Sequence, residues 1–129
     1  MSTLKVDNIR DNGTGFNDVV SFQNANGTEN GRLCRAFVNF NGDGAVAIRA
    51  NFNVNSITDH GVGDFTATFT NAMSDANYSI NGTMSVNAHT AGTIFAPLND
   101  GVATGSVRVI DARGQGQADR PIISVAIFR

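Results

Sequence analysis

The chain has 129 residues, which is enough for one domain with a modest hydrophobic core. Nine basic and eleven acidic residues give a formal net charge of −2, and the basic residues are scattered, which argues against nucleic acid as a partner. Cys34 is the single cysteine, so no internal disulfide is possible, and we expect an inert buried thiol. No window approaches the run of about 18 apolar residues that crosses a bilayer, so no membrane insertion is predicted.

The first 31 residues are predicted to form an N-terminal arm and loop. Residues 3–9 alternate apolar and polar side chains as a short strand does, and residues 11–15 (Asp-Asn-Gly-Thr-Gly) are typical of a turn. Residues 24–31 are polar, without core-forming side chains, and this composition favours a loop. The start also lacks the apolar stretch of a secretion signal, so we expect that the protein does not direct its own export.

Residues 32–129 are predicted to form the body, an antiparallel β-sandwich or a jelly-roll-like module. A period of two marks residues 36–40, after which the turn at 41–44 (Asn-Gly-Asp-Gly) leads into a strand at 46–49. A second hairpin joins residues 52–58 to residues 64–70 through a glycine-containing turn. Asparagine, glycine and threonine are abundant whereas helix-surface residues are sparse, so the fold class is all-β. The remaining strands are expected at 78–86, 93–96, 105–112 and 122–128.

The last of these strands, residues 122–128, is apolar at almost every position. A strand of this kind needs cover on both faces, and the core of one small domain supplies limited cover. We therefore predict that a homotrimer buries it. The predicted subunit interface consists of Ile122, Ile123, Val125, Ile127 and Phe128.

Residues 39–44 match the first half of a calcium-binding loop, with oxygen donors at alternate positions and a glycine at the sixth. The twelfth position, where a bidentate glutamate belongs, is Ala50. A hairpin turn explains the same residues, so no metal site is predicted.

No sequence motif indicates catalysis. The histidines, His60 and His89, lie outside any metal-ligand spacing. A triad of Ser79 or Ser85 with His89 and Asp100 lacks the Gly-x-Ser-x-Gly turn of a serine hydrolase. We therefore predict a non-enzymatic protein without a cofactor, and a small hydrolase is the least favoured alternative.

Two stretches resemble a known group of proteins. The first is Ser-Thr-Leu-Lys-Val-Asp-Asn-Ile at residues 2–9. The second runs from residue 36 to residue 78 and includes Ala-Phe-Val-Asn-Phe-Asn-Gly at 36–42 and Val-Ala-Ile-Arg at 46–49. Together they resemble the tail-fibre-like and other minor virion proteins of marine tailed phages, especially cyanophages. The resemblance implies a β-rich, usually trimeric module on the virion surface, whose N-terminal segment docks to the particle.

The functional expectation is therefore a phage virion structural protein, assembled in the host cytoplasm and attached to another virion protein of the tail or capsid. The predicted docking arm includes Thr3, Leu4, Lys5, Val6 and Ile9. The chain is short for a tail fibre and has no shaft repeat or coiled-coil heptads, which keeps a capsid decoration protein, a cement or knob, as an alternative.

The body could also bind a host-surface glycan. A free-standing carbohydrate-binding, lectin-like module is the alternative to a virion structural protein. Such a module usually presents aromatic side chains to the sugar. The chain has no tryptophan and one tyrosine, Tyr78, so its nine phenylalanines are expected to serve mostly in the core.

Overall fold

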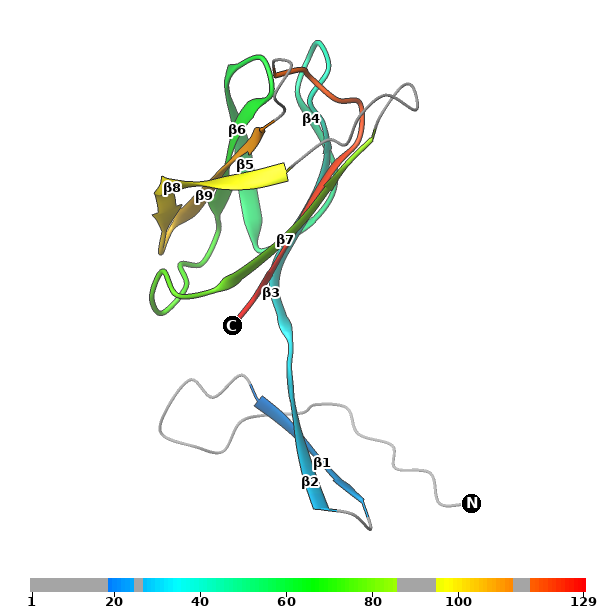
Figure 1. Cartoon of the computed structure of the whole chain (residues 1–129), viewed down its shortest axis with the longest axis vertical. Helices are drawn as coiled ribbons and strands as arrows, with labels where there is room; N and C mark the ends of the chain where they lie inside the picture. Colours follow the sequence, from blue (N-terminus) through cyan, green and yellow to red (C-terminus); the bar gives the residue numbers. More distant parts are fainter. Residues whose placement is uncertain (1–18, 25–26, 86–94, 113–116) are drawn as a thin grey trace. The chain divides into compact units, whose positions relative to one another are not determined.

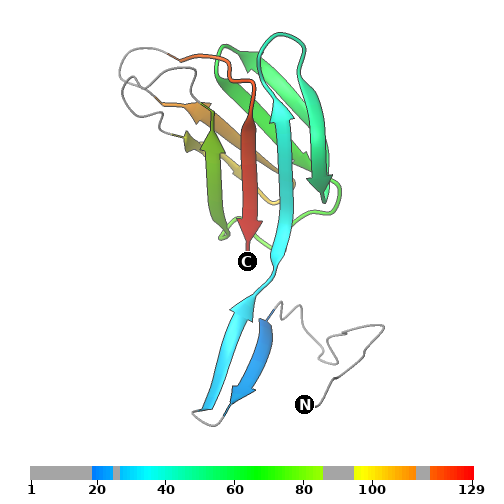
Figure 2. The same ribbon diagram turned by 90° about the vertical axis from the view of Figure 1, so that its right-hand side faces the viewer.

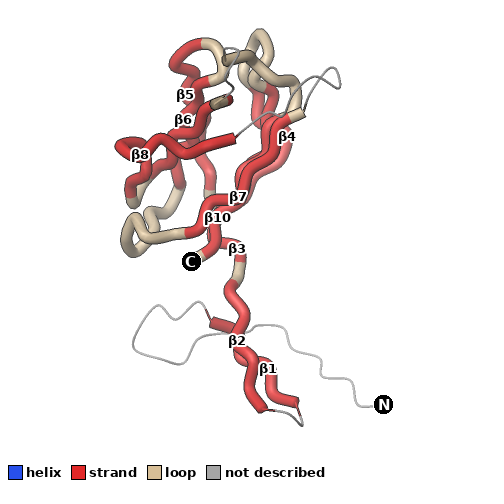
Figure 3. Tube along the Cα trace, viewed as in Figure 1, coloured by secondary structure: helices blue, strands red, loops and turns tan. Residues whose placement is uncertain are grey.

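The computed structural model describes residues 19–24, 27–85, 95–112 and 117–129 (Figure 1). Every regular element within these ranges is a β-strand, which confirms the all-β prediction (Figure 3). No described segment is a helix of the length and apolar character needed to cross a bilayer. The chain divides into two compact units, Met1–Leu33 and Cys34–Arg129.

In the N-terminal unit, β1 (Val19–Asn24) and β2 (Gly27–Arg32) pair as an antiparallel hairpin. The prediction of a loop at 24–31 is therefore wrong. Strand pairing uses backbone groups and needs no apolar side chains, so a polar segment can form a strand. The predicted strand at 3–9 lies outside the described residues.

The body consists of two antiparallel four-stranded sheets packed as a sandwich, as predicted. The first sheet has the order β4-β3-β10-β7, with β3 (Cys34–Asn41), β4 (Ala47–Phe52), β7 (Ser79–Met84) and β10 (Ile123–Phe128). The second has the order β5-β6-β9-β8, with β5 (Val54–Gly61), β6 (Asp64–Phe69), β8 (Phe95–Ala103) and β9 (Ser106–Asp111). Figure 2 looks onto the first sheet, where the last strand of the chain, β10, lies between β3 and β7.

The hydrophobic core lies between the sheets, because alternate residues of each strand point inward. Strand β6 shows this alternation clearly: Phe65, Ala67 and Phe69 are buried, and the residues between them are partly exposed. The two sheets meet through aromatic as well as aliphatic contacts, since Phe40 of β3 and Phe65 of β6 pack edge to face with ring centroids 5.3 Å apart. The buried apolar set is Ala36, Val38, Phe40, Val54, Phe65, Ala67, Phe69, Met73, Tyr78, Val107, Val109, Ile123, Val125 and Ile127.

The chain passes from the first sheet to the second at Asn53, where the sequence pattern predicts one continuous strand over 52–58. Asn53 has a φ of 54°, a left-handed conformation that asparagine adopts more readily than most residues, so β4 ends and β5 begins there. Its side-chain Nδ2 donates to the carbonyls of Arg35 at 3.1 Å and Asn71 at 3.0 Å. Its Oδ1 accepts from the Asn71 backbone N–H at 2.7 Å, so this side chain fastens the corner between the sheets.

Strand β10 is covered by its own chain on the inner face. Ile123, Val125 and Ile127 are at most 3% exposed and belong to the core. The prediction that these three residues form a subunit interface is therefore wrong, because a side chain already buried in the sandwich offers no surface to a partner. The physical reason lies in the alternation with Ser124 and Ala126, whose small side chains point outward.

Ile122 and Phe128 differ from the other predicted interface residues. Ile122 is exposed and Phe128 is partly exposed, so both stay available as predicted interface residues. With the inner face of β10 covered, the apolar terminal strand no longer argues for a homotrimer. The trimer stays a prediction that rests on the resemblance alone.

Candidate functional site

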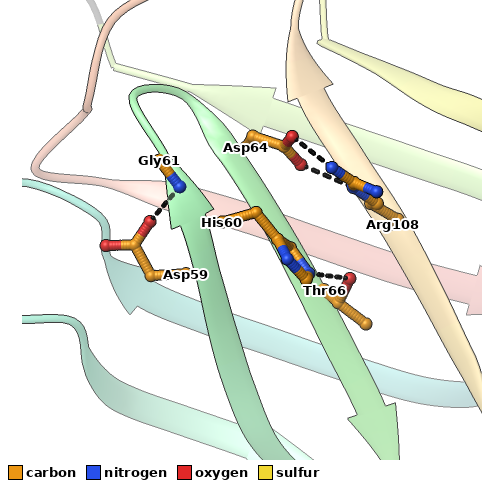
Figure 4. Close-up of polar contacts among 6 residues, drawn as sticks. All are labelled: Asp59, His60, Gly61, Asp64, Thr66 and Arg108. Carbon is orange, nitrogen blue, oxygen red and sulfur yellow. Dashed lines mark hydrogen bonds and ion pairs between the residues drawn. The ribbon is translucent and has the colours of Figure 1, made fainter.

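The outer face of the second sheet carries a charged cluster (Figure 4). Arg108 of β9 and Asp64 of β6 form a bidentate ion pair, with Arg108 Nε 2.8 Å from Asp64 Oδ1 and Arg108 Nη2 2.6 Å from Asp64 Oδ2. On the same face, His60 Nε2 lies 2.9 Å from Thr66 Oγ1. The Gly61 backbone N–H donates to the carboxylate of Asp59 at 2.8 Å, which stabilises the turn between β5 and β6.

A pocket of about 180 Å³ lies beside this ion pair. Its lining combines charged and hydroxyl-bearing side chains with backbone from the β8–β9 hairpin. The lining residues are His60, Thr66, Asp100, Gly101, Ala103, Ser106 and Arg108.

The ion pair fixes the charges of both partners. The hydrogen bond from the Arg108 guanidinium lowers the pKa of Asp64 below its usual value, although partial burial opposes this effect. The carboxylate in turn raises the pKa of Arg108. Two groups held in their charged forms are suited to holding structure or a ligand, whereas general acid–base chemistry needs a group that titrates near the working pH.

Acidification is expected to weaken the body through Asp64. Because its folded-state pKa is lowered, its stabilising contribution is complete above the unfolded-state value of 3.8 and is lost as the pH falls through the folded-state pKa. Asp64→Asn removes the titrating group and should cost under about 1 kcal/mol at neutral pH, since the pair is partly exposed and screened by solvent. Urea unfolding at about pH 6 and about pH 3 measures the difference.

The comparison variant for this experiment is Arg108→Met, which removes the cause of the pKa shift and leaves the carboxyl in place. Both variants should show a smaller loss of stability on acidification than the wild type. An identical acid slope in all three proteins would show that the ion pair contributes nothing to folding.

The outer face of the first sheet carries a different feature, a shallow trough that crosses β3, β10 and β7. The strand register places Asn39, Ser124 and Thr83 in one row and Phe37, Ala126 and Asn81 in another. The central strand supplies the small side chains and its neighbours supply the larger ones, which produces a hollow of about 370 Å³. We define the trough by its lining residues: Phe37, Val38, Asn39, Asn81, Gly82, Thr83, Ser124, Val125 and Ala126.

The trough has one aromatic wall, and its uncharged lining combines polar side chains with apolar ones. Phe37 is 40% exposed and packs against Phe52, itself 54% exposed, with ring centroids 6.3 Å apart. Asn39 Nδ2 donates to Ser124 Oγ at 2.7 Å, which fixes the amide across the strands. Phe37 and Phe52 thus lie outside the core, contrary to what their apolar character favours, although Phe40, Phe65 and Phe69 are buried as expected.

Only some of the residues that the sequence singled out lie within the described ranges. The docking-arm residues Thr3, Leu4, Lys5, Val6 and Ile9 lie outside the described residues, as does His89. Ser85 Oγ accepts from the Ile122 backbone N–H at 3.1 Å. Cys34 is partly buried, and its thiol lies 3.2 Å from the Ala36 carbonyl.

The calcium-like segment forms the turn between β3 and β4. Asn41 Nδ2 donates to the carbonyls of Asp43 at 2.6 Å and Ala45 at 3.1 Å, and Gly44 adopts a φ of 67°. The carbonyl oxygens of Asp43 and Ala45 therefore accept hydrogen bonds within the turn. Within the described ranges, no group of three or more His, Cys, Asp or Glu side chains is placed to hold a metal ion.

Sequence reasoning missed the trough altogether. The signal was present in β10, where Ser124 and Ala126 alternate with Ile123, Val125 and Ile127, but an almost unbroken apolar run conceals a period of two. No protein-family model matches the chain, and neither the curated proteins nor the solved structures give a match. The geometry of the two units and the resemblance of the sequence therefore carry the functional proposal.

Proposed function

We propose that the chain is a structural protein of a tailed-phage particle, an appendage or tail-fibre-like module that attaches through its N-terminal unit. The observation that carries this proposal is the hairpin of that unit. Among the described strands, β1 and β2 pair only with each other. An isolated two-stranded hairpin is at best marginally stable in water, so a partner that supplies a further strand or an apolar surface would stabilise it.

The structure of the body is a second observation that supports this proposal. It has its own closed core between two four-stranded sheets, so it needs no partner to complete that core. A self-sufficient sandwich joined to a hairpin in need of a partner is the organisation expected of a module that docks through one unit and displays the other. The proposed partner is another virion protein, and the proposed location is the virion, after assembly in the host cytoplasm.

Removal of the docking arm together with the hairpin is the direct test. Particles assembled with a chain that lacks residues 1–32 should contain at least about tenfold less of this protein than wild-type particles, as expected if the N-terminal unit supplies most of the docking free energy. Immunoblots of purified particles measure the copy number. Fluorescence of Tyr78, the single tyrosine in a chain without tryptophan, reports whether the body of the truncated protein is still folded. Normal incorporation of a folded, truncated chain would refute the docking proposal.

The second candidate is a capsid decoration protein. It is favoured by the compact form of the body, because the described strands from β3 to β10 make one sandwich and include no repeated shaft. Immunogold labelling of the body on intact particles separates the two candidates. Label on the tail supports the appendage, and label on the head supports decoration.

A further inference from the structure

We propose that the trough on the outer face of the first sheet binds an uncharged saccharide. Phe37 stacks on the sugar ring, and the amides of Asn39 and Asn81 bind its hydroxyls. This inference stands on the body alone, and only its meaning for host attachment rests on the proposed function.

The shape of the trough favours a small ligand. Its volume of about 370 Å³ lies at the lower end of the range of about 300–1,000 Å³ that is typical of small-molecule sites. Its floor is set by Ser124 and Ala126 on β10, and the longer side chains of β3 and β7 stand on either side. A sugar ring that lies between the two walls, with one face against Phe37, would reach the polar side chains of the floor and of the opposite wall.

The charge of the lining favours a neutral ligand. None of the nine lining residues has an ionisable side chain. A charged ligand would lose part of its hydration in the trough without gaining an opposite charge, which costs free energy. The ion pair of Asp64 and Arg108 lies on the other sheet, so the two outer faces differ sharply in chemistry.

The chemical groups in the trough match those of a sugar. A pyranose ring has a face of C–H groups and a rim of hydroxyls that both donate and accept hydrogen bonds. The exposed ring of Phe37, held by Phe52, offers an apolar surface for the first. Asparagine amides offer a donor and an acceptor side by side for the second, and the exposed Asn81 side chain makes no hydrogen bond within the described residues.

A second copy of the chain is a poorer occupant of this face. The exposed apolar side chains of this sheet are scattered: Phe37 and Phe52 lie on the β3–β4 side and Ile122 lies just before β10, whereas β7 presents Asn81 and Thr83. A stable interface between copies needs a continuous apolar centre, which this distribution does not provide.

The test begins with the full-length protein on a printed array of neutral and acidic oligosaccharides. We expect at least one neutral oligosaccharide to bind and the acidic ones, such as hexagalacturonate, not to bind. Titration of the strongest neutral ligand into ¹⁵N-labelled protein should shift the amide resonances of the trough. Absence of any neutral ligand, preference for acidic ones, or shifts confined to other surfaces would overturn the inference. So would concentration-dependent shifts of the trough in the absence of sugar, which would show that a second copy covers it.

Variants sharpen the test. Phe37→Ala should weaken binding at least about tenfold, and Phe37→Tyr, which keeps the ring, should stay within about threefold of the wild type. Asn81→Ala should weaken binding about fivefold or more. The matched control is Asn55→Ala, which removes an exposed asparagine from β5, an edge strand of the other sheet, and should leave affinity unchanged. Unchanged affinity in both Phe37→Ala and Asn81→Ala would refute the assignment.

Incorporation of a trough variant into particles distinguishes this inference from the docking proposal. The full chain with Asn81→Ala should be incorporated at the normal copy number, because the substitution lies outside the N-terminal unit, while its sugar binding falls. Normal incorporation with intact sugar binding would contradict the trough and leave the docking proposal untouched, whereas a loss of incorporation with reduced sugar binding would contradict docking through the N-terminal unit alone.

Discussion

Replacement of Phe65 by alanine is expected to destabilise the body by about 3–5 kcal/mol. Phe65 is fully buried and packs edge to face against Phe40 of the opposite sheet, with ring centroids 5.3 Å apart. Truncation removes both the burial of the ring and this contact between the sheets. It is therefore expected to be among the most disruptive single changes in the core.

The surroundings of Phe65 place the effect toward the upper end of that range. One neighbour is Gly42, where an added Cβ would lie 2.8 Å from Phe65 Cζ and 2.7 Å from Ile123 Cδ1. Glycine has no side chain that could move into the space left by the ring. The cavity therefore persists, and the cost of a core truncation rises with the volume that stays empty.

Urea unfolding followed by the fluorescence of Tyr78 measures this prediction. Tyr78 is a suitable probe because it is buried in the same core, packs against Phe69 at 6.0 Å and donates its hydroxyl hydrogen to the carbonyls of the β8–β9 hairpin. The matched control is Phe52→Ala on the outer face, which should cost well under about 2 kcal/mol because its ring is 54% exposed. Equal unfolding midpoints for the two variants would show that Phe65 does not occupy a closed core.

Period-two patterns predict the sheets well where one face is apolar and the other is polar. The strand at 64–70 is an example, because phenylalanine and alanine alternate with threonine and the observed β6 follows them. The hairpin of β3 and β4 was predictable for a similar reason, since the turn residues between them favour left-handed or tightly turned backbone. In these segments the local pattern and the tertiary packing demand the same structure.

The pattern fails where tertiary context decides. Whether β10 is an outer or an inner strand depends on which strands flank it, and its sequence does not contain the identity of β3 and β7 as neighbours. The break at Asn53 depends on partners at Arg35 and Asn71, each 18 residues away. The trough could not be predicted because it requires the register of three strands that are distant in the chain.

The second large effect is expected at Arg120, where charge is buried at one end of the sandwich. The Nε of Arg120 lies 3.4 Å from Oδ2 of Asp111, and the two side chains are 8% and 0% exposed. Backbone contacts join this pair to two turns: the Arg120 carbonyl accepts from the Gly42 N–H at 2.8 Å, and the Gly63 carbonyl accepts from the Asp111 N–H at 2.8 Å. The ion pair thus lies where the ends of both sheets are tied together.

Asp111→Asn should destabilise the body by about 3–5 kcal/mol, because removal of one member of a buried ion pair leaves the other charge uncompensated. The charge of Arg120 is already imperfectly satisfied, since its Nη2 is buried without a hydrogen-bond partner. Urea unfolding followed by Tyr78 fluorescence again provides the measurement. Arg129→Met serves as the matched control, because it breaks a pair with Asp75 that is partly exposed and should cost under about 1 kcal/mol.

A double variant distinguishes a requirement for charge from a requirement for filled space. Arg120→Met combined with Asp111→Leu removes both charges and keeps an apolar filling of similar size, so its stability should recover most of what Asp111→Asn loses. Recovery would mean that one buried charge without the other destabilises the body, whereas the loss of both charges together does not. If the double variant is as unstable as Asp111→Asn, the hydrogen bonds of these side chains, and not the balance of charge, hold the ends of the two sheets together.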